Sequence, residues 1–313
     1  MRVGLVGCGP WGANILRDLT ILGCDVTVAA RHASTQARAA SGGAARVVTS
    51  WSALVELAGE LDGLVVANES SGHAEALRLL VGLGKPIFVE KPLCVDPDEA
   101  SRLAESGGGQ IFLMDKWRYH AGIATLADVS RSGRLGRVLG VRTRRNQWGS
   151  AHRDVDELWT LMPHDLAVVE QILGVLPPTR SVVADRVDGA VGCATVVFGQ
   201  APWAVVECLG RSPVRERAVT VFGTVAVAQL ATAEADEVVV YPIVEGPADA
   251  SGVADGAVAW RIPVVGEWPL LAELRDFVGF LGGGPAPRAT VADGARHVHR
   301  IAEILAMANH EGR

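Results

Sequence analysis

Residues 1–12 read MRVGLVGCGPWG, a short apolar run that leads into a glycine-rich turn. The apolar run at 2–6 predicts a short strand, and the glycines after it form the pattern G-x-G-x-x-G at Gly7, Gly9 and Gly12. In a strand–turn–helix unit the first glycine permits the tight turn and the second lets the backbone approach a pyrophosphate. The third lets the helix pack closely on the strand. The pattern predicts a dinucleotide-binding Rossmann unit; the alternative is a glycine-rich turn without a ligand.

Working outward, strands and helices alternate as far as about residue 115, which predicts a parallel sheet covered on both faces. After Asp115, short alternating runs separated by Gly, Pro and Asp predict an antiparallel sheet. We therefore expect a Rossmann domain over 1–116 and an α+β domain over 117–313. The final helices, expected at Pro269–Leu281 and Thr290–Ala308, can pack back on the Rossmann domain. Val244–Val258 is rich in Gly, Pro and Asp and is expected to be a surface loop.

The composition excludes several classes of protein. The 313 residues are 49% hydrophobic and 20% charged, with a net charge of −6 that gives no support for nucleic-acid binding. No apolar run is long enough to span a bilayer, and only Met1 and Arg2 precede Val3 of the first strand, so we expect neither a membrane segment nor a signal peptide. The five cysteines form no C-x-x-C pair, so we expect no metal site, no disulfide framework and a cytoplasmic location.

The end of the second strand bears on the choice of cofactor. An acidic residue there would bind the adenosine ribose of NAD(H), but the strand instead runs into Arg31 and His32, with Ser34 just beyond. Arg31 can pair with a 2′-phosphate, and His32 and Ser34 can add hydrogen-bond donors. We expect NADP(H) to be preferred, with NAD(H) possible; the alternative is that Arg31 is a solvated loop residue.

A second motif, Glu90-Lys91-Pro92, follows the strand at 87–89. The carboxyl end of a parallel strand faces the crevice in which α/β proteins bind ligands. A lysine held there by the following proline suits the polarisation of a carbonyl or alkoxide oxygen.

Together these motifs resemble the glucose–fructose oxidoreductase and inositol dehydrogenase (Gfo/Idh/MocA) family. The resemblance covers essentially the whole chain and is carried by GCGPWG, Asn68-x-x-x-Gly72-His73, the G-K-P-x-x-x-E-K-P strand from Gly84 to Leu93, Arg118, and His164-Asp165-Leu166. It implies a Rossmann domain plus an α+β domain with a large open, mostly antiparallel sheet, often used to form a homodimer or homotetramer. The cofactor-binding residues we expect from the motifs and the resemblance are Gly7, Gly9, Pro10, Trp11, Gly12, Arg31, His32, Ser34, Asn68, His73, Glu90, Lys91 and Pro92.

The resemblance also implies hydride transfer between a nicotinamide and a sugar, polyol or nucleotide-sugar carbon. Lys91 would hold and polarise the reacting oxygen, and His164 would be the acid/base. The residues expected to meet substrate are Lys91, Arg118, Tyr119, Trp148, Trp159, Thr160 and His164. Tryptophan is the commonest aromatic residue, used eight times. Its flat face suits stacking on a sugar ring or nicotinamide, although ordinary core or interface packing is the more common explanation for any single tryptophan.

Pro163 is expected to open a helix, Pro163–Leu173, which would place His164 at its N-terminus. The positive end of the helix dipole would then keep the imidazole neutral and able to accept a proton. Asp165, in the same first turn, would stabilise the dipole. The alternative for His164 is a structural histidine bonded to the backbone.

The sequence departs from the family pattern at the position one helical turn before His164. Many family members carry Asp there, and this chain has Thr160, which cannot hold a charge at neutral pH. We expect Thr160 to orient Lys91 or His164, and its presence favours ketone reduction over alcohol oxidation. The alternatives are a reductase of an imine or non-sugar ketone, and a cofactor-binding protein with impaired catalysis.

Overall fold

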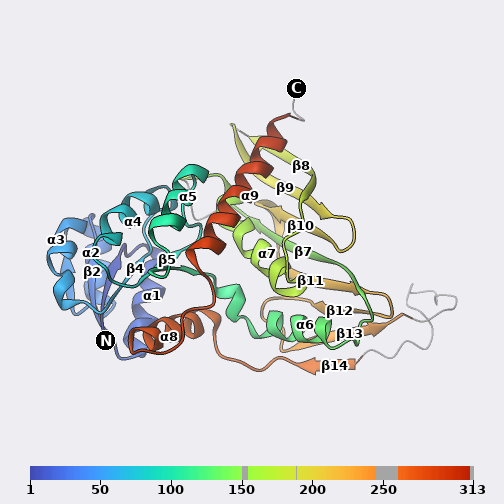
Figure 1. Ribbon diagram of the computed structural model, residues 1–313, viewed down its shortest axis with the longest axis horizontal. Helices are drawn as coiled ribbons and strands as arrows, with labels where there is room; N and C mark the ends of the chain where they lie inside the picture. The colour runs from blue at the N-terminus through green and yellow to red at the C-terminus, as the bar shows by residue number, and fades with distance from the viewer. Residues whose placement is uncertain (150–153, 188, 244–259, 311–313) are drawn as a thin grey trace. The chain divides into compact units, whose positions relative to one another are not determined.

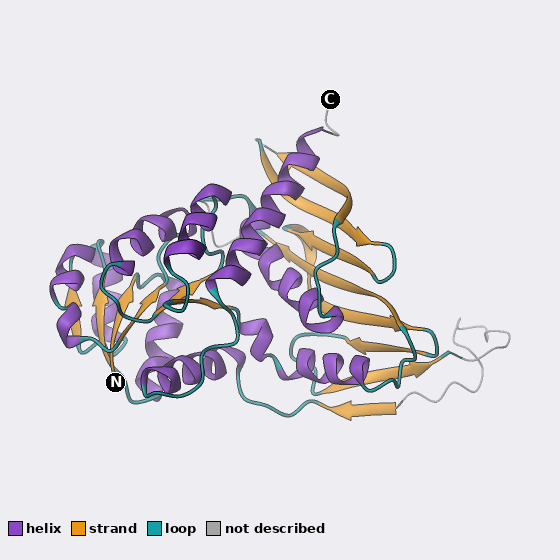
Figure 2. Cartoon of the chain, viewed as in Figure 1, coloured by secondary structure: helices purple, strands orange, loops and turns teal. Residues whose placement is uncertain are grey.

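The computed structural model describes residues 1–149, 154–187, 189–243 and 260–310, so the expected loop Val244–Val258 lies outside the described residues. The chain divides into two compact units. The first unit contains Met1–Lys116, Trp268–Ala302 and, from the connecting segment, Asp154 and Val155; the second unit contains the other described residues. Each unit is built around one sheet (Figures 1 and 2).

The sheet of the first unit has the strand order β3-β2-β1-β4-β5-β6, and each neighbouring pair is parallel. Its strands are β1 (Arg2–Val6), β2 (Asp25–Ala29), β3 (Arg46–Val48), β4 (Gly63–Val66), β5 (Ile87–Glu90) and β6 (Ile111–Met114). Successive crossovers run in opposite directions from β1, so the carboxyl ends of β1 and β4 flank the switch point at which such folds bind ligands. This arrangement confirms the predicted Rossmann fold.

Helices of the first unit begin where the sequence offers suitable first turns. Prolines occupy the first turns of three of them, and Asp96 accepts a hydrogen bond from the Glu99 backbone N–H at 2.9 Å. The helices are α1 (Pro10–Ile21), α2 (Ala33–Ser41), α3 (Trp51–Glu56), α4 (His73–Val81), α5 (Pro97–Ser106) and α8 (Pro269–Leu281), with short 3-10 turns η1 (Ala58–Glu60) and η2 (Ser70–Gly72).

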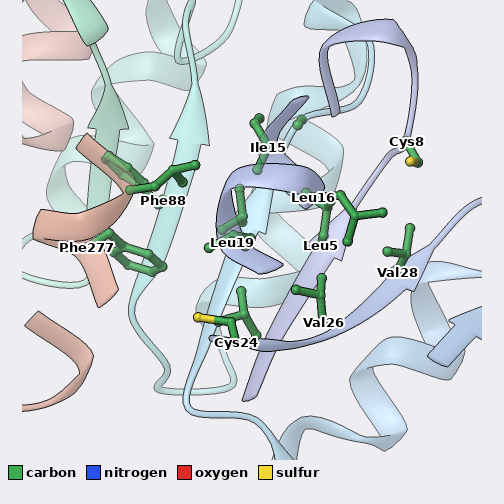
Figure 3. Close-up of a cluster of buried hydrophobic side chains, with 14 of the residues drawn as sticks. Leu5, Cys8, Ile15, Leu16, Leu19, Cys24, Val26, Val28, Phe88 and Phe277 are labelled. Carbon is green, nitrogen blue, oxygen red and sulfur yellow. The ribbon is translucent and has the colours of Figure 1, made fainter. Parts of the chain in front are cut away.

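The core of the first unit joins β1, β2 and β5 to α1 and α8 (Figure 3). Leu5, Ile15 and Leu19 are completely buried, and the ring of Phe277 on α8 stacks on Phe88 of β5 with centroids 4.9 Å apart. Burying such side chains contributes roughly 1.5–3 kcal/mol each. The contact explains why α8, nearly two hundred residues after β5, belongs to this unit.

The sheet of the second unit has the order β14-β13-β12-β11-β7-β10-β9-β8 and is antiparallel except where β7 pairs with β10. Its strands are β7 (Val138–Trp148), β8 (Thr179–Val187), β9 (Ala190–Gly199), β10 (Trp203–Leu209), β11 (Arg211–Gly223), β12 (Ala226–Leu230), β13 (Glu237–Pro242) and β14 (Trp260–Pro263). The sequence did not predict β14. The helical segments are η3 (Lys116–Tyr119), α6 (Ala121–Arg131), α7 (Glu157–Leu173) and α9 (Val291–His310), of which η3 and α9 continue from the first unit. The open, mostly antiparallel sheet is confirmed.

The expected start of one helix is wrong. Helix α7 begins at Glu157 rather than Pro163, so Pro163 lies inside it. A proline in a helix interior withholds one hydrogen bond, here the one to the Trp159 carbonyl, and strains the preceding turn. Leu158 and Met162 are completely buried, and this packing outweighs the local preference of the proline.

Candidate active site

The glycine turn after β1 has the geometry that a dinucleotide needs. Gly7 has φ +90°, and a side chain there would meet Ala67 and Asn68 backbone atoms at 2.8 Å. A Cβ on Gly12 would lie 2.6 Å from the Gly7 carbonyl oxygen, whereas a Cβ on Gly9 would meet nothing within 4 Å. Gly7 and Gly12 are therefore required by close packing, and Gly9 leaves open space before the N-terminus of α1. A pyrophosphate fits this arrangement.

Arg31 lies just beyond β2 with its side chain 47% exposed. Its guanidinium sits 4.5 Å from the centre of the Trp51 ring and 3.7 Å from a Glu69 carboxylate oxygen. His32 is the residue before α2, and Ser34 is exposed in its first turn. The sequence reasoning missed Arg38 on α2, whose guanidinium donates to the Cys8 carbonyl of the glycine turn at 3.0 Å.

His73 joins the end of β4 to the turn after β5. It is buried, with Nδ1 at 2.7 Å from the Pro92 carbonyl oxygen and Nε2 at 3.2 Å from that of Asn68. Burial lowers the pKa of His73, against the opposing effect of the two carbonyl oxygens. The neutral ring donates to one of these two carbonyls, so His73 ties two loops of the expected cofactor site together.

The Glu-Lys-Pro turn is connected to the glycine turn through Trp11. The Trp11 indole N–H donates to one oxygen of Glu90, whose other oxygen accepts the Lys91 backbone N–H at 3.1 Å. The Lys116 ammonium lies 4.4 Å from the centre of the Trp11 ring. Burial raises the pKa of Glu90, although Lys91 and the Trp11 hydrogen bond oppose that rise. Trp11 and Glu90 thus fix the backbone from which Lys91 projects.

Thr160 and His164 lie one turn apart on the same face of α7, and both are buried. The Thr160 hydroxyl donates to the Glu157 carbonyl oxygen at 2.9 Å. His164 lies about two turns into the helix. The expectation that the positive helix end keeps His164 neutral is therefore wrong, because a dipole effect fades within the first turn.

A buried stack of side chains surrounds His164 in the second unit. The Trp117 ring lies 6.2 Å from that of His164, stacks on His120 at 4.8 Å, and carries the Arg145 guanidinium 4.4 Å from its centre. Arg145 in turn binds Asp165 at 2.5 Å. Asp165 was expected to stabilise a helix end, and that is wrong because it forms this buried ion pair. The signal was present in β7, since alternation puts Arg145 on the face opposite Arg142 and Arg144.

The other expected substrate residues have varied surroundings. Arg118 forms an ion pair with Glu170 of α7 at 2.7 Å, and Tyr119 is buried. Trp159 is buried in α7, whereas Trp148, the last residue of β7, is 78% exposed.

His120 accepts from the Gly122 N–H at 3.1 Å and contacts the Ala233 carbonyl oxygen at 2.9 Å. The accepting nitrogen must lack a proton, so the other nitrogen donates and the tautomer is defined. His120 is therefore occupied by structural hydrogen bonds.

Parts of this sequence are similar to known proteins. Residues 1–107 match the family described as "Oxidoreductase family, NAD-binding Rossmann fold". The chain is 31% identical to an inositol 2-dehydrogenase of Saccharopolyspora erythraea over 56% of this chain and 54% of that protein. It is also 31% identical to a myo-inositol dehydrogenase of Streptomyces leeuwenhoekii over 61% of this chain and 59% of that protein. The aligned part spans little more than half the length of these relatives.

Solved structures share the fold over nearly the whole length. A UDP-N-acetylglucosamine 3-dehydrogenase of Acidithiobacillus ferrooxidans superimposes with a TM-score of 0.82 at 18% identity, covering 99% of this chain and 98% of that one. A levoglucosan dehydrogenase, solved with NADH and levoglucosan, gives 0.81 at 18% identity, with coverage of 99% and 98%. Among the described residues, no helix combines the length and apolar character needed to cross a membrane.

Proposed function

We propose that this chain is a member of the Gfo/Idh/MocA oxidoreductase family and that it transfers a hydride between a nicotinamide cofactor and a sugar-like substrate. The reacting carbon would be a carbonyl or secondary alcohol carbon of a sugar, polyol or nucleotide-sugar. The observation that carries the proposal is the link from the glycine turn through Trp11 and Glu90 to Lys91. It ties the turn expected to bind phosphate to the lysine expected to meet the reacting oxygen.

The bound nicotinamide would supply or accept the hydride, and side chains of this chain would manage charge and protons. Lys91 would place its ammonium against the substrate oxygen and stabilise negative charge as it develops there. His164 would take the alcohol proton in oxidation or return a proton in reduction. Thr160, which shares a helix face with His164, would position that ring.

We expect NADPH-driven reduction to be the favoured direction. Thr160 stands where many family members carry Asp, so His164 lacks a neighbouring carboxylate that would strengthen it as a base. This lack weakens alcohol oxidation more than ketone reduction. In reduction, Lys91 or protonated His164 can donate the proton. The same residue supports two alternatives: reduction of an imine or non-sugar ketone, and impaired catalysis with retained cofactor binding.

NADPH consumption with a panel of keto-sugars, imines and non-sugar ketones tests the activity and separates these alternatives. Lys91→Ala and His164→Ala should each lower kcat by about 10²–10⁴-fold while cofactor binding persists. Lys85→Ala is the matched control and should stay near the parent rate. Unchanged turnover in the Lys91 and His164 variants would remove both residues from these roles.

The preference for NADP(H) is supported by Arg31. Its guanidinium is held by Trp51 and remains half exposed. Arg31→Ala should raise KM for NADPH by roughly 10–100-fold, in line with the loss of hydrogen bonds to a charged group, and change KM for NADH much less. Arg46→Ala, which removes an exposed arginine paired with Glu60, is the control. Equal effects on both cofactors would reject the NADP(H) assignment.

A homo-oligomer formed through the open sheet is part of the proposal. On β10, Ala204 and Val206 are completely buried, while Trp203 and Val205 on the opposite face are half-buried. This partly exposed face combines Trp203 and Val205 with the Arg142–Glu207 ion pair, and a mixed face of this kind suits a second copy of the chain. Light scattering should report a dimer or tetramer, and Val205→Glu should shift it towards monomer. A monomeric parent protein would reject this part.

A cytoplasmic location is also proposed. The five cysteines are free thiols, which suits a reducing compartment. Recovery of the native protein in a periplasmic or secreted fraction would contradict it.

A further inference from the structure

One buried acid in the first unit has no role in the mechanism so far. Glu273 lies on α8, is 1% exposed, and its Oε2 atom has no hydrogen-bond partner among the described residues. An ionised carboxylate in such a place is costly unless it is paired and hydrogen-bonded. The position therefore requires either a partner or a proton.

Packing of α8 on β5 determines what faces Glu273. The Phe277 ring stacks on Phe88 with centroids 4.9 Å apart, and both side chains are labelled in Figure 3. Glu90 follows Phe88 by two residues on the same strand face, about 6.6 Å along β5. Glu273 precedes Phe277 by one turn on the same helix face, about 6 Å along α8. The stacked aromatic pair holds α8 against the strand that carries Glu90, and Glu90 acts electrostatically on Glu273.

The charges around Glu273 are unbalanced. The carboxylates of Glu90 and Asp115 and the ammonium groups of Lys91 and Lys116 all act on it electrostatically. If Glu273 is ionised, the cluster holds three negative charges and two positive ones. If Glu273 is neutral, the two remaining carboxylates balance the two ammonium groups. Burial is the largest cause that raises the pKa of Glu273 well above its usual value, and Glu90 and Asp115 add to it.

We propose that Glu273 carries a proton at neutral pH and shares it with the carboxylate of Glu90, and so acts as a positioning residue for Lys91. Each Glu90 oxygen already accepts one hydrogen bond, from Trp11 or from the Lys91 backbone, and retains a lone pair for another. A protonated Glu273 restrains Glu90, and Glu90 restrains the backbone of the Glu-Lys-Pro turn. Because the protonated Glu273 is neutral, it does not attract the Lys91 ammonium towards the interior. The second half of this proposal rests on the proposed role of Lys91.

The protonation state can be measured without a substrate. Carboxyl-¹³C-labelled glutamate, followed by NMR through a pH titration, should show a carboxyl that stays protonated at pH 7 in the parent protein. The signal should disappear in Glu273→Gln and persist in Glu99→Gln. Glu99 is the matched control because it is buried in the same unit but pairs with Arg78 and Arg102.

Two NMR outcomes would overturn the proposal. The first is the absence of any protonated glutamate at pH 7 in the parent protein, which needs no variant. The second is a signal that survives in Glu273→Gln but is lost in Glu90→Gln, which would place the proton on Glu90 instead.

Turnover tests the positioning role. Glutamine mimics a protonated carboxyl, so Glu273→Gln should keep kcat within about threefold of the parent, while Glu273→Ala should lose roughly 10–100-fold, as expected when a catalytic group is misplaced. The KM for the cofactor should change less than kcat. An equal loss in both variants would reject the role. If no substrate is turned over, the proposed activity fails, yet the NMR result still decides the proton on Glu273.

Discussion

The two units each bury an acid on a helix, and they accommodate it in opposite ways. Asp165 on α7 and Glu273 on α8 are both 1% exposed. Asp165 meets the Arg145 guanidinium at 2.5 Å, whereas Glu273 faces two other carboxylates and two lysines. In the second unit the buried charge of Asp165 is compensated by Arg145. In the first unit the neutral form of Glu273 is more favourable than the ionised form.

This difference has consequences for how each unit responds to change. The Arg145–Asp165 pair holds the Trp117 ring beside His164, so it fixes the geometry of an expected acid/base residue. It should be intolerant of losing one partner. The Glu273 cluster should tolerate a neutral amide but respond to pH, because its charge balance depends on one proton.

The largest expected effect comes from breaking the pair in the second unit. Arg145→Met should lower the free energy of unfolding by about 3–5 kcal/mol, since it leaves Asp165 buried without its cation. Urea denaturation at pH 7 measures this loss. The matched control is Arg142→Met on the same strand, whose pair with Glu207 is exposed and should be worth about 0–1 kcal/mol. Similar losses in both variants would mean that burial of the pair is unimportant.

A smaller effect is expected in the first unit, and it should depend on pH. The folded chain retains a proton on Glu273 that the unfolded chain releases above its usual pKa of 4.5. The contribution of this site is therefore complete below pH 4.5 and is lost as the pH rises towards the folded pKa. Glu273→Gln should remove that slope and should become progressively more stable relative to the parent as the pH rises from 4.5 to 8. Parallel stability curves for the two proteins would contradict this expectation.

The smallest effect is expected from placing an acid at position 160, one turn before His164, where this chain has a threonine. Thr160→Asp would place a carboxylate one turn before His164 and should raise the pKa of that imidazole by about one unit. NMR titration of His164 measures the shift, and the rate of alcohol oxidation should rise relative to ketone reduction. Thr160→Asn, which adds no charge, is the control. An unshifted imidazole would show that the two side chains do not interact.

The fold was largely predictable because its signals are local. Strand–helix alternation and the spacing of Gly7, Gly9 and Gly12 predicted the Rossmann unit, and short alternating runs predicted the second sheet. The start of α7 was not predictable, because Pro163 is a strong local signal that only the packing of Leu158 and Met162 overrides. β14 was missed because its four residues are mostly exposed and show no clear alternation.

The candidate site divides in the same way. The sequence by itself determined the turns that carry Gly9 and Lys91, since their geometry follows from residue types within a few positions of each other. The folded structure was needed to show that Trp11 joins these turns through Glu90, that Arg145 compensates Asp165, and that Glu90 acts electrostatically on the buried Glu273. Each of these contacts links segments far apart in the chain. Charged and polar groups interact more strongly in a low-dielectric interior, and that interior exists only once the units have folded.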